Sequence, residues 1–312
     1  MRAVVTGAAG FIGSHLCERL LKDEWDVVGV DNFNDFYDPQ VKRANVRECM
    51  AHESFRLVEA DIRDAEAMHA AVARDTDAIV HLAAMAGVRP SIDEPLLYSD
   101  VNVNGTLVML EAARKAEVAK FIFASSSSVY GNNEKVPFSE DDNVDFPISP
   151  YAATKKACEL ICHTYHALYD MPMTCLRFFT VYGPRQRPDL AIHKFAKLIE
   201  SGRPIPIYGD GTKMRDFTYI DDIIDGVVAA IKHCEDFHTY NLGESQPISV
   251  NDLVSRIERA LGTTAQREYM SAQPGDVERT FADVSRAERE LGYHPRTDID
   301  TGLAEFVRWL RQ

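Results

Sequence analysis

The sequence has no long hydrophobic run and no excess of positive charge. A helix that crosses a bilayer needs about 20 apolar residues in a row, and no such run occurs, so we expect no membrane partner. The first residues, MRAVVTGAAGFIG, are broken by glycines and lack the apolar centre of a signal peptide. The 48 Asp and Glu outnumber the 34 Lys and Arg, which gives a formal net charge of −14. Because no basic tract offsets this charge, we also expect no nucleic-acid partner.

Cysteine is also sparse and scattered, which excludes a disulfide scaffold. The six cysteines follow no paired spacing, and reduced thiols in a cytoplasmic protein are the simplest interpretation. Cys158, Cys162 and His166 stand four residues apart and would share one face of a helix. Three ligands with no evident fourth make a poor zinc site, whereas small buried residues on a packed helix are common. We therefore predict no metal.

What the chain does have is a regular alternation of strand and helix patterns. Short apolar runs typical of buried strands occupy residues 2–6, 26–30, 55–59, 78–82, 120–124 and 174–178. Helical spacing of apolar residues marks residues 11–21, 65–73, 104–116 and 151–169. Parallel strands need such crossovers, so residues 1–180 are predicted to form an α/β Rossmann domain with a doubly wound parallel sheet. Residues 181–312 are more mixed and predict a smaller, mainly substrate-binding domain, with residues 240–242 returning to the main sheet.

A glycine-rich loop, Gly7-Ala-Ala-Gly10-Phe-Ile-Gly13, lies directly between the first strand and the first helix. In this pattern the first glycine permits a tight turn, the second lets a pyrophosphate approach the backbone, and the third lets the helix pack on the strand. The phosphates would rest on the amides of the helix N-terminus. Three glycines alone can form an ordinary turn, but their place between strand and helix indicates a dinucleotide site.

Asp31 ends the second strand, eighteen residues after Gly13. A carboxylate at this position accepts hydrogen bonds from ribose hydroxyls and repels a 2′-phosphate. The following residues, beginning with Asn32, include no arginine to hold such a phosphate, so we predict NAD as the cofactor, not NADP. Asp61 and Ile62, just after the third strand, are placed to contact the adenine, although an Asp there can also cap the next helix.

Tyr151-Ala-Ala-Thr-Lys155 puts a phenol and an ammonium on one face of a predicted helix. A free phenol is a poor base at neutral pH, but a neighbouring ammonium favours its ionised form. Four serines, residues 125–128, follow a strand at the edge where open α/β sheets bind ligands. A tyrosine and a lysine at this spacing occur by chance. Together with the glycine loop and Asp31, in this order, they indicate a catalytic site.

These motifs resemble the extended short-chain dehydrogenase/reductase family, which contains nucleotide-sugar epimerases and dehydratases. The resemblance covers the whole chain and implies Ser126, Tyr151 and Lys155 as the catalytic set. It also implies that further residues beside the loop and the strand ends bind NAD, together with Tyr151 and Lys155: Phe11, Ile12, Asn32, Leu82, Ala83, Ala84 and Asn102.

Longer segments resemble the UDP-glucuronate 4-epimerases of that family, namely residues 30–38, 81–89, 138–169 and 176–191. Met85 and Leu190 depart from the residues common there. The resemblance implies an isomerase that interconverts UDP-glucuronic and UDP-galacturonic acid, using bound NAD and a transient 4-keto sugar with no net redox. It also implies a homodimer formed through the helices at residues 104–116 and 151–169.

Because the chain as a whole is acidic, a UDP-sugar acid must be bound by a few local arginines. Residues 209–222 resemble the family's diphosphate-binding stretch, which implies Arg215 as a phosphate ligand; an ion pair with a neighbouring aspartate is the simpler alternative. Residues 273–276 resemble the stretch that meets the uridine ribose and phosphates, which implies a contact from Asp276. Gln273 stands where relatives often have arginine, so one phosphate contact differs.

The sugar carboxylate needs a cation in a protected site, and a guanidinium can bind it bidentately. Arg187, in the sequence PRQRPD, is the first candidate, while Arg89 and Arg185 are candidates for the same anion or for the diphosphate. Further hydrogen bonds to the carboxylate or the sugar hydroxyls are predicted from Ser127, Ser128 and Thr180. A basic loop held by neighbouring acids is the simpler interpretation of PRQRPD.

Other activities stay open. A UDP-glucuronate decarboxylase shares both cofactor and substrate, and a UDP-glucose/galactose 4-epimerase would leave Arg187 without its anion. A 4,6-dehydratase typically uses a Thr-Asp-Glu set, and Ser126-Ser127-Ser128 offers no such carboxylates. A silent NAD-binding regulatory relative is the non-enzyme alternative, because a fold does not fix an activity. The intact Ser126, Tyr151 and Lys155 argue against it.

Overall fold

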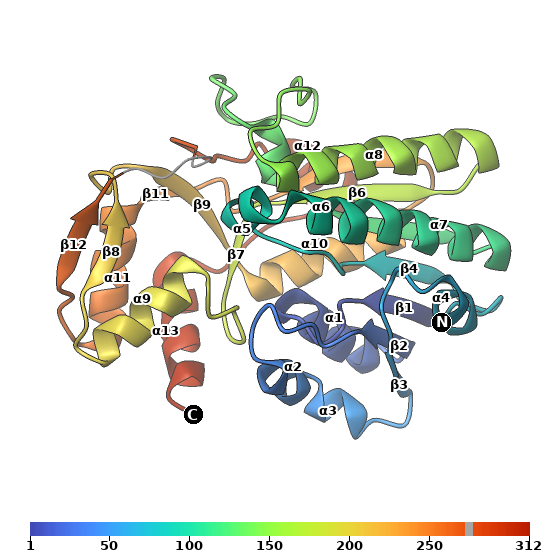
Figure 1. The fold of residues 1–312 in the computed structure, drawn as a ribbon, viewed down its shortest axis with the longest axis horizontal. Coiled ribbons are helices and arrows are strands. Elements are labelled where there is room, and N and C mark those ends of the chain that lie inside the picture. Colours follow the sequence, from blue (N-terminus) through green and yellow to red (C-terminus); the bar gives the residue numbers. More distant parts are fainter. Residues whose placement is uncertain (272–276) are drawn as a thin grey trace.

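The computed structural model describes residues 1–271 and 277–312, and its centre is a seven-stranded, all-parallel sheet (Figure 1). The strands are β1 (Arg2–Thr6), β2 (Asp26–Asp31), β3 (Phe55–Glu59), β4 (Ala78–His81), β5 (Lys120–Ser126), β6 (Met173–Phe178) and β10 (Phe237–Leu242). Their order is β10-β6-β5-β4-β1-β2-β3. The direction of the crossovers reverses between β1 and β4, which is where open α/β sheets bind ligands.

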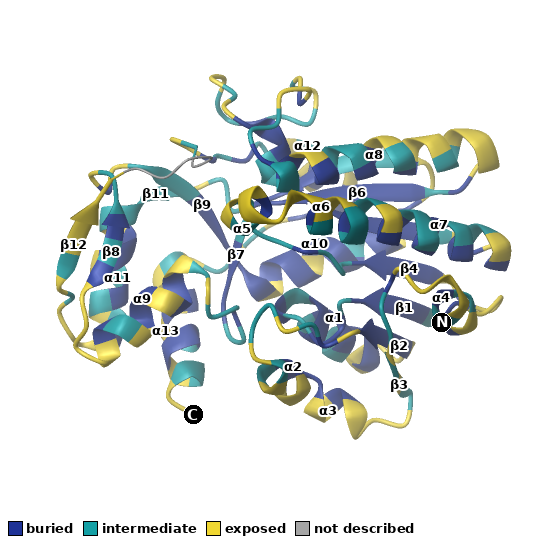
Figure 2. Ribbon diagram, viewed as in Figure 1, coloured by how far each residue is buried: buried dark blue, intermediate teal, exposed yellow. Residues whose placement is uncertain are grey.

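Helices cover both faces of this sheet, which explains why its central strands are continuous apolar runs. One buried cluster joins the sheet to α1 (Phe11–Lys22) and α10 (Ile220–Lys232), and the other joins it to α4 (Ala65–Ala71), α7 (Gly105–Ala116) and α8 (Pro150–Tyr169). Val4 and Val5 of β1 belong to different clusters because successive strand residues point to opposite faces. Figure 2 shows the central strands buried between these helices.

Short helical segments complete this part of the fold: α2 (Pro39–Asn45), α3 (Arg47–Met50), α5 (Val88–Asp93), α6 (Pro95–Ser99), the π-helical turn η1 (Asp100–Asn104), the 3₁₀ turn η2 (Ser127–Tyr130) and α12 (Ser285–Leu291). A smaller group of elements lies at the left of Figure 1. It has one sheet of β7 (Thr180–Tyr182), β9 (Met214–Tyr219) and β11 (Pro247–Ser249), a second of β8 (Ile205–Tyr208) and β12 (Arg267–Met270), and helices α9 (Ala191–Glu200), α11 (Val250–Leu261) and α13 (Ile299–Leu310). Among the described helices, none combines the length and the apolar character that crossing a membrane requires.

The predicted doubly wound parallel sheet is confirmed, with small differences at strand ends. Strand β5 continues past its apolar run, because Ser125 and Ser126 still pair with β6 and the buried Ser125 hydroxyl has a partner in Glu159. Strand β10 comes from the later half of the chain and pairs with β6 at the edge of the main sheet. The division of the chain at residue 180 stays a prediction.

Candidate functional site

The phosphate loop depends on glycines whose missing side chains let the strand, the loop and the helix touch. Gly7 has a φ of +69°, and the amide of Gly10 donates to its carbonyl oxygen at 3.0 Å. A Cβ on Gly13 would lie only 2.0 Å from that same oxygen. Helix α1 begins at Phe11, directly after the turn, and the first amides of a helix have no helical acceptor. The loop is therefore built to hold an anion.

This loop forms one wall of a cavity of about 500 Å³ at the carboxyl ends of the strands. Most of the residues predicted to hold the cofactor line it: Gly7, Gly10, Phe11, Ile12, Gly13, Asp31, Asn32, Ile62, Leu82, Ala83, Ala84, Tyr151 and Lys155. The glycine loop and the Tyr–Lys pair, more than 130 residues apart in the sequence, thus face one space. Such a volume suits an extended small-molecule ligand.

Asp31 ends β2 at this cavity and is nearly buried. Its carboxylate accepts the amides of Ala9 at 3.0 Å and Phe33 at 2.9 Å. Burial raises the pKa of this carboxyl, and the two amides act against the rise. Lys42, which sequence reasoning missed, lines the same cavity and donates to the Asn34 carbonyl at 2.6 Å. No local pattern marks Lys42, because its place near Asp31 depends on how α2 folds back.

Two residues predicted to bind the cofactor, Asp61 and Asn102, are not among the described residues that line either cavity. The Asp61 carboxylate accepts from Arg63 at 2.8 Å and from Asn32 at 3.0 Å, and the bond to Arg63 holds the pKa of Asp61 at about 2. The Asn102 side chain bonds the amide of Met85 at 2.8 Å and its carbonyl at 3.0 Å. Asn102 therefore supports the loop that follows β4.

A buried hydrogen-bond chain fixes the end of β4. Thr6 Oγ1 lies 2.7 Å from His81 Nδ1, and His81 Nε2 lies 3.1 Å from Thr106 Oγ1. The Thr106 hydroxyl donates to the Asn102 carbonyl at 2.6 Å, so Nε2 must carry the imidazole proton. Burial lowers the pKa of His81 to about 3, which keeps the ring neutral. Thr6 Oγ1 also accepts the amide of Ala83 at 3.1 Å, so the chain positions the backbone that lines the cavity.

Helix α8 presents Tyr151 and Lys155 to the cavity. Its start is fixed by Ser149, whose side chain accepts the amide of Ala152 at 3.2 Å. Lys155 is 4% exposed, and its ammonium donates to the Ala124 carbonyl at 2.6 Å. The same ammonium lies 6.0 Å from the centre of the Tyr151 ring. A positive charge that is itself almost fully shielded from water is therefore held beside the phenol.

The four serines at the junction of β5 and η2 occupy different environments. The Ser125 hydroxyl donates to the buried Glu159 carboxylate at 2.6 Å. Ser126 lines the larger cavity, accepts the amide of Ser128 at 3.1 Å and begins η2. Ser127 and Ser128 line both the larger cavity and a smaller one beside it.

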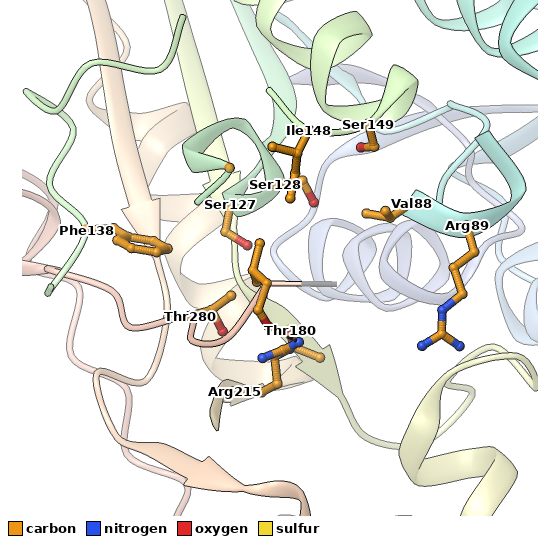
Figure 3. A pocket seen from close by; sticks show the side chains of 12 residues that line it. Val88, Arg89, Ser127, Ser128, Phe138, Ile148, Ser149, Thr180, Arg215 and Thr280 are labelled. Carbon is orange, nitrogen blue, oxygen red and sulfur yellow. Dashed lines mark hydrogen bonds between the residues drawn. The ribbon is translucent and has the colours of Figure 1, made fainter. Parts of the chain in front are cut away.

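The smaller cavity has a volume of about 160 Å³ and shares Val88, Ser127, Ser128 and Thr180 with the larger one. Figure 3 shows the side chains that line it. Five of the residues predicted to bind substrate line it: Arg89, Ser127, Ser128, Thr180 and Arg215. They come from α5, η2, β7 and β9, and Figure 3 shows Arg215 close to Thr180, with Arg89 on the other side. The guanidinium of Arg89 lies 4.5 Å from the centre of the Tyr208 ring, and Arg215 donates to the Val277 carbonyl at 2.7 Å.

The two arginines of the loop after β7 point to different places. Arg187 lines the larger cavity and pairs with Asp189, with Nε–Oδ1 at 3.0 Å and Nη2–Oδ2 at 2.9 Å. Arg185, at a φ of +64°, pairs with Glu18 of α1 at 2.7 Å and is absent from the described lining of both cavities. Arg187 is thus placed to meet a ligand, whereas Arg185 anchors the loop.

Gln273 and Asp276 lie outside the described residues, so their roles stay predictions. Cys158 and Cys162, which share one face of α8, are both buried in the cluster that includes α7. Within residues 1–271 and 277–312, no three His, Cys, Asp or Glu side chains are arranged to hold a metal ion.

Comparison with known proteins gives consistent results. The family model described as GDP-mannose 4,6 dehydratase matches residues 4–306. The chain is 44% identical over 311 residues to the UDP-glucuronate 4-epimerase of Thermodesulfobacterium geofontis, which covers 99% of this chain and 96% of the relative. The crystal structure of the Bacillus cereus UDP-glucuronic acid 4-epimerase with UDP-glucuronic acid and NAD matches with a TM-score of 0.95 and 39% identity, over 100% of this chain and 99% of the other. The UDP-glucose 4-epimerase of Thermotoga maritima with UDP-glucose matches with a TM-score of 0.92 and 32% identity, over 100% and 99%.

The neutral state of His81 predicts a dependence of stability on pH. An unfolded histidine takes up a proton below about pH 6.5, whereas the buried His81 does not, so the unfolded state gains protons and the free energy of unfolding falls with falling pH. We expect a loss of up to about 1.4 kcal/mol per pH unit from this group below pH 6.5. Urea unfolding at pH 7 and pH 5 measures the loss, and His81→Gln is expected to make it smaller. An unchanged slope in that variant would assign the effect to another histidine such as the partly buried His15, whose pKa burial lowers to about 4.

Proposed function

The chain belongs to the GDP-mannose 4,6 dehydratase family of extended short-chain dehydrogenases/reductases, and from this premise we propose that it is an NAD-dependent 4-epimerase of UDP-glucuronic acid and UDP-galacturonic acid. The observation that carries the proposal is that the phosphate loop, Tyr151, Lys155 and Arg187 all line one cavity. Full-length relatives that are UDP-glucuronate 4-epimerases support this choice of substrate.

The residues of the larger cavity fit NAD. Gly13 lies so close to the Gly7 carbonyl that no side chain would fit, so the start of α1 packs against the loop, and Gly10, without a side chain, lines the cavity where a pyrophosphate would approach the backbone. Asp31 offers a buried carboxylate at the end of β2 for the ribose hydroxyls. When bound there, NAD supplies reversible hydride transfer at the sugar C4, so that configuration is inverted with no net redox.

In this proposal the chain's own residues hold the sugar and move its proton. Tyr151 takes the proton of the C4 hydroxyl and later returns it, and Ser126 shares a hydrogen bond with that hydroxyl. Lys155, fixed by the Ala124 carbonyl, keeps a positive charge near the phenolate while the proton is away. Because Lys155 is almost fully buried, its charge is only weakly screened by water.

The sugar carboxylate must be held in place during the reaction. A 4-keto uronic acid is a β-keto acid and loses CO₂ when the bond from C5 to the carboxylate aligns with the carbonyl π system. We propose that Arg187, with Thr180 and Ser127, holds the carboxylate out of that alignment. Asp189 already binds Arg187 through two of its nitrogens, so the substrate meets an oriented guanidinium whose charge is partly neutralised.

The composition of the cavities argues against a dehydratase. A 4,6-dehydratase needs a carboxylic acid beside the sugar to expel the C6 hydroxyl as water. Among the described residues that line the two cavities, Asp31 is the one carboxylate, and it lies at the cofactor end. Serines and threonine surround the sugar side instead, which favours the epimerase.

A homodimer and a cytoplasmic location are further parts of the proposal. Helix α8 exposes apolar side chains along its outer face, with Leu160 at 57% and Leu168 at 66% exposure, and pairing with a second copy would cover them. The six cysteines are all free thiols, which suits a reducing compartment.

Replacing the base tests the chemistry. Tyr151→Phe is expected to lower turnover of UDP-glucuronic acid by about 10²–10⁴-fold, because it removes the proton-transfer group and leaves the fold intact. The bound NAD per subunit should stay the same, as measured by release on denaturation. Tyr98→Phe is the matched control. The Tyr98 ring packs edge-on against Tyr151, with the ring centres 6.3 Å apart, and its hydroxyl donates to the Ala86 carbonyl and not to the cavity. Equal turnover in Tyr151→Phe and the wild type would contradict the assigned base.

Replacing the arginines tests the choice of substrate. Arg187→Met should lower kcat/KM for UDP-glucuronic acid about 10- to 100-fold more than for UDP-glucose, because a charge-assisted hydrogen bond is worth about 1.5–3 kcal/mol. It should also let the 4-keto intermediate lose CO₂, so that NMR detects a UDP-4-keto-pentose or, once NADH has returned the hydride to C4, UDP-xylose. Arg185→Met is the control: it removes a similar charge at the anchor to Glu18 and should leave the ratio unchanged. A larger change of the ratio in Arg185→Met than in Arg187→Met would reverse the assignment.

A further inference from the structure

We propose that the buried ion pair of Glu159 and Arg177 positions the catalytic helix against the serine segment, so that these residues act on the reaction through Tyr151 and Lys155 without touching the substrate. The inference rests on the proposed function, but one of its tests needs no substrate.

The ion pair joins α8 to β6 inside the protein. Glu159 lies one helical turn after Lys155, and its two carboxylate oxygens accept Nε and Nη2 of Arg177, each at 2.9 Å. Both side chains are 4% exposed. Burial alone would raise the pKa of Glu159, but the bonds from Arg177 and Ser125 hold it below its ordinary value. The carboxylate is therefore charged and has a fixed orientation.

Two bonds, one helical turn apart, tie α8 to the end of β5. The Lys155 ammonium donates to the Ala124 carbonyl at 2.6 Å, and the Ser125 hydroxyl donates to Glu159 at 2.6 Å. A single bond would still allow the helix to rotate about it, whereas two bonds along its length fix both register and rotation. Tyr151, one turn before Lys155, is thereby fixed relative to Ser126, the residue that follows Ser125.

The Arg177 guanidinium is also connected, through a chain of hydrogen bonds, to the wall of the smaller cavity. Arg177 Nη1 donates to the Tyr130 hydroxyl at 3.0 Å, and that hydroxyl donates to Asn241 Oδ1 at 2.7 Å. Asn241 in turn donates to the Phe138 carbonyl at 2.9 Å. Phe138 lines the smaller cavity, and Tyr130 ends the turn that carries Ser127 and Ser128. The network thus links the Tyr–Lys helix to the wall of the sugar pocket.

Stability alone is a poor reason for such a pair. Taking two charges out of water is costly, and apolar side chains of similar volume stabilise a core equally well or better. What a charged, bidentate pair adds is a defined geometry at both ends. The geometry fixed here is that of the groups that must exchange a proton with the sugar, where small displacements reduce rates strongly.

Ser125→Ala tests the tie between strand and helix with the least disturbance, because it removes one hydroxyl and leaves the ion pair in place. We expect kcat per bound NAD to fall about 10- to 100-fold with KM for UDP-glucuronic acid nearly unchanged. Tyr130→Phe removes the hydroxyl that links Arg177 to Asn241, and so the connection to the wall of the smaller cavity. This variant should raise KM more than it lowers kcat. Thr164→Ala is the control, since its hydroxyl bonds only the Leu160 carbonyl within the same helix among the described partners. A Ser125→Ala variant with wild-type kcat per bound NAD would overturn the proposal, even if it melts at a lower temperature.

A crystal structure without substrate separates this proposal from the proposed function. The Lys155 ammonium lies 6.0 Å from the centre of the Tyr151 ring and donates to the Ala124 carbonyl. If the network positions the helix, Ser125→Ala shifts α8 relative to the end of β5 and changes these two distances, whereas Thr164→Ala keeps them. A shifted helix in a protein that turns over no UDP-sugar would remove the proposed function and keep the positioning role. Unchanged distances would remove the positioning role whatever the substrate.

Discussion

The carboxyl ends of all seven parallel strands meet at one edge of the sheet, and the candidate site depends on this constraint. Because each crossover returns the chain to the same side, residues far apart in sequence gather there: the loop after β1, Asp31 at the end of β2, the backbone after β4 and the serines at the end of β5 and in η2. Helices on both faces bury the strands and hold this edge rigid. A catalytic site that needs fixed distances between a base, a cofactor and a sugar is best built on such an edge.

Charge is the second constraint, because a chain with a net charge of −14 is proposed to bind an anionic cofactor and an anionic sugar nucleotide. Attraction by the whole protein is excluded, so binding must rely on local groups. Each cationic group near the cavities is held by a partner within the protein: Lys155 by a carbonyl, Arg187 by Asp189, and Arg89 by the face of Tyr208. These partners orient the charges before a ligand arrives, which reduces the entropy lost on binding.

Local sequence patterns predicted the parts of the site that local geometry determines. The strand-loop-helix order and the spacing of Tyr151 and Lys155 follow from chain periodicity, and the main sheet agrees with them. Sequence patterns were less informative where loop conformation or long-range packing determines which way a side chain points. The left-handed backbone at Arg185 sends that side chain to α1, and neither composition nor spacing distinguishes it from Arg187. Likewise, Asp64 and not Asp61 caps α4, a distinction that depends on a turn of three residues.

The contact of Glu159 with Arg177 and the place of Lys42 beside Asp31 belong to the same class. These contacts form only once separate elements have packed, so no sequence motif predicts them.

The most direct measurement of the central claim is proton NMR of the purified protein incubated with UDP-glucuronic acid and no added NAD. The proposed epimerase predicts that UDP-galacturonic acid accumulates with little UDP-pentose, from cofactor retained through purification. Accumulation of UDP-xylose, or no product even after NAD⁺ is added, would contradict it.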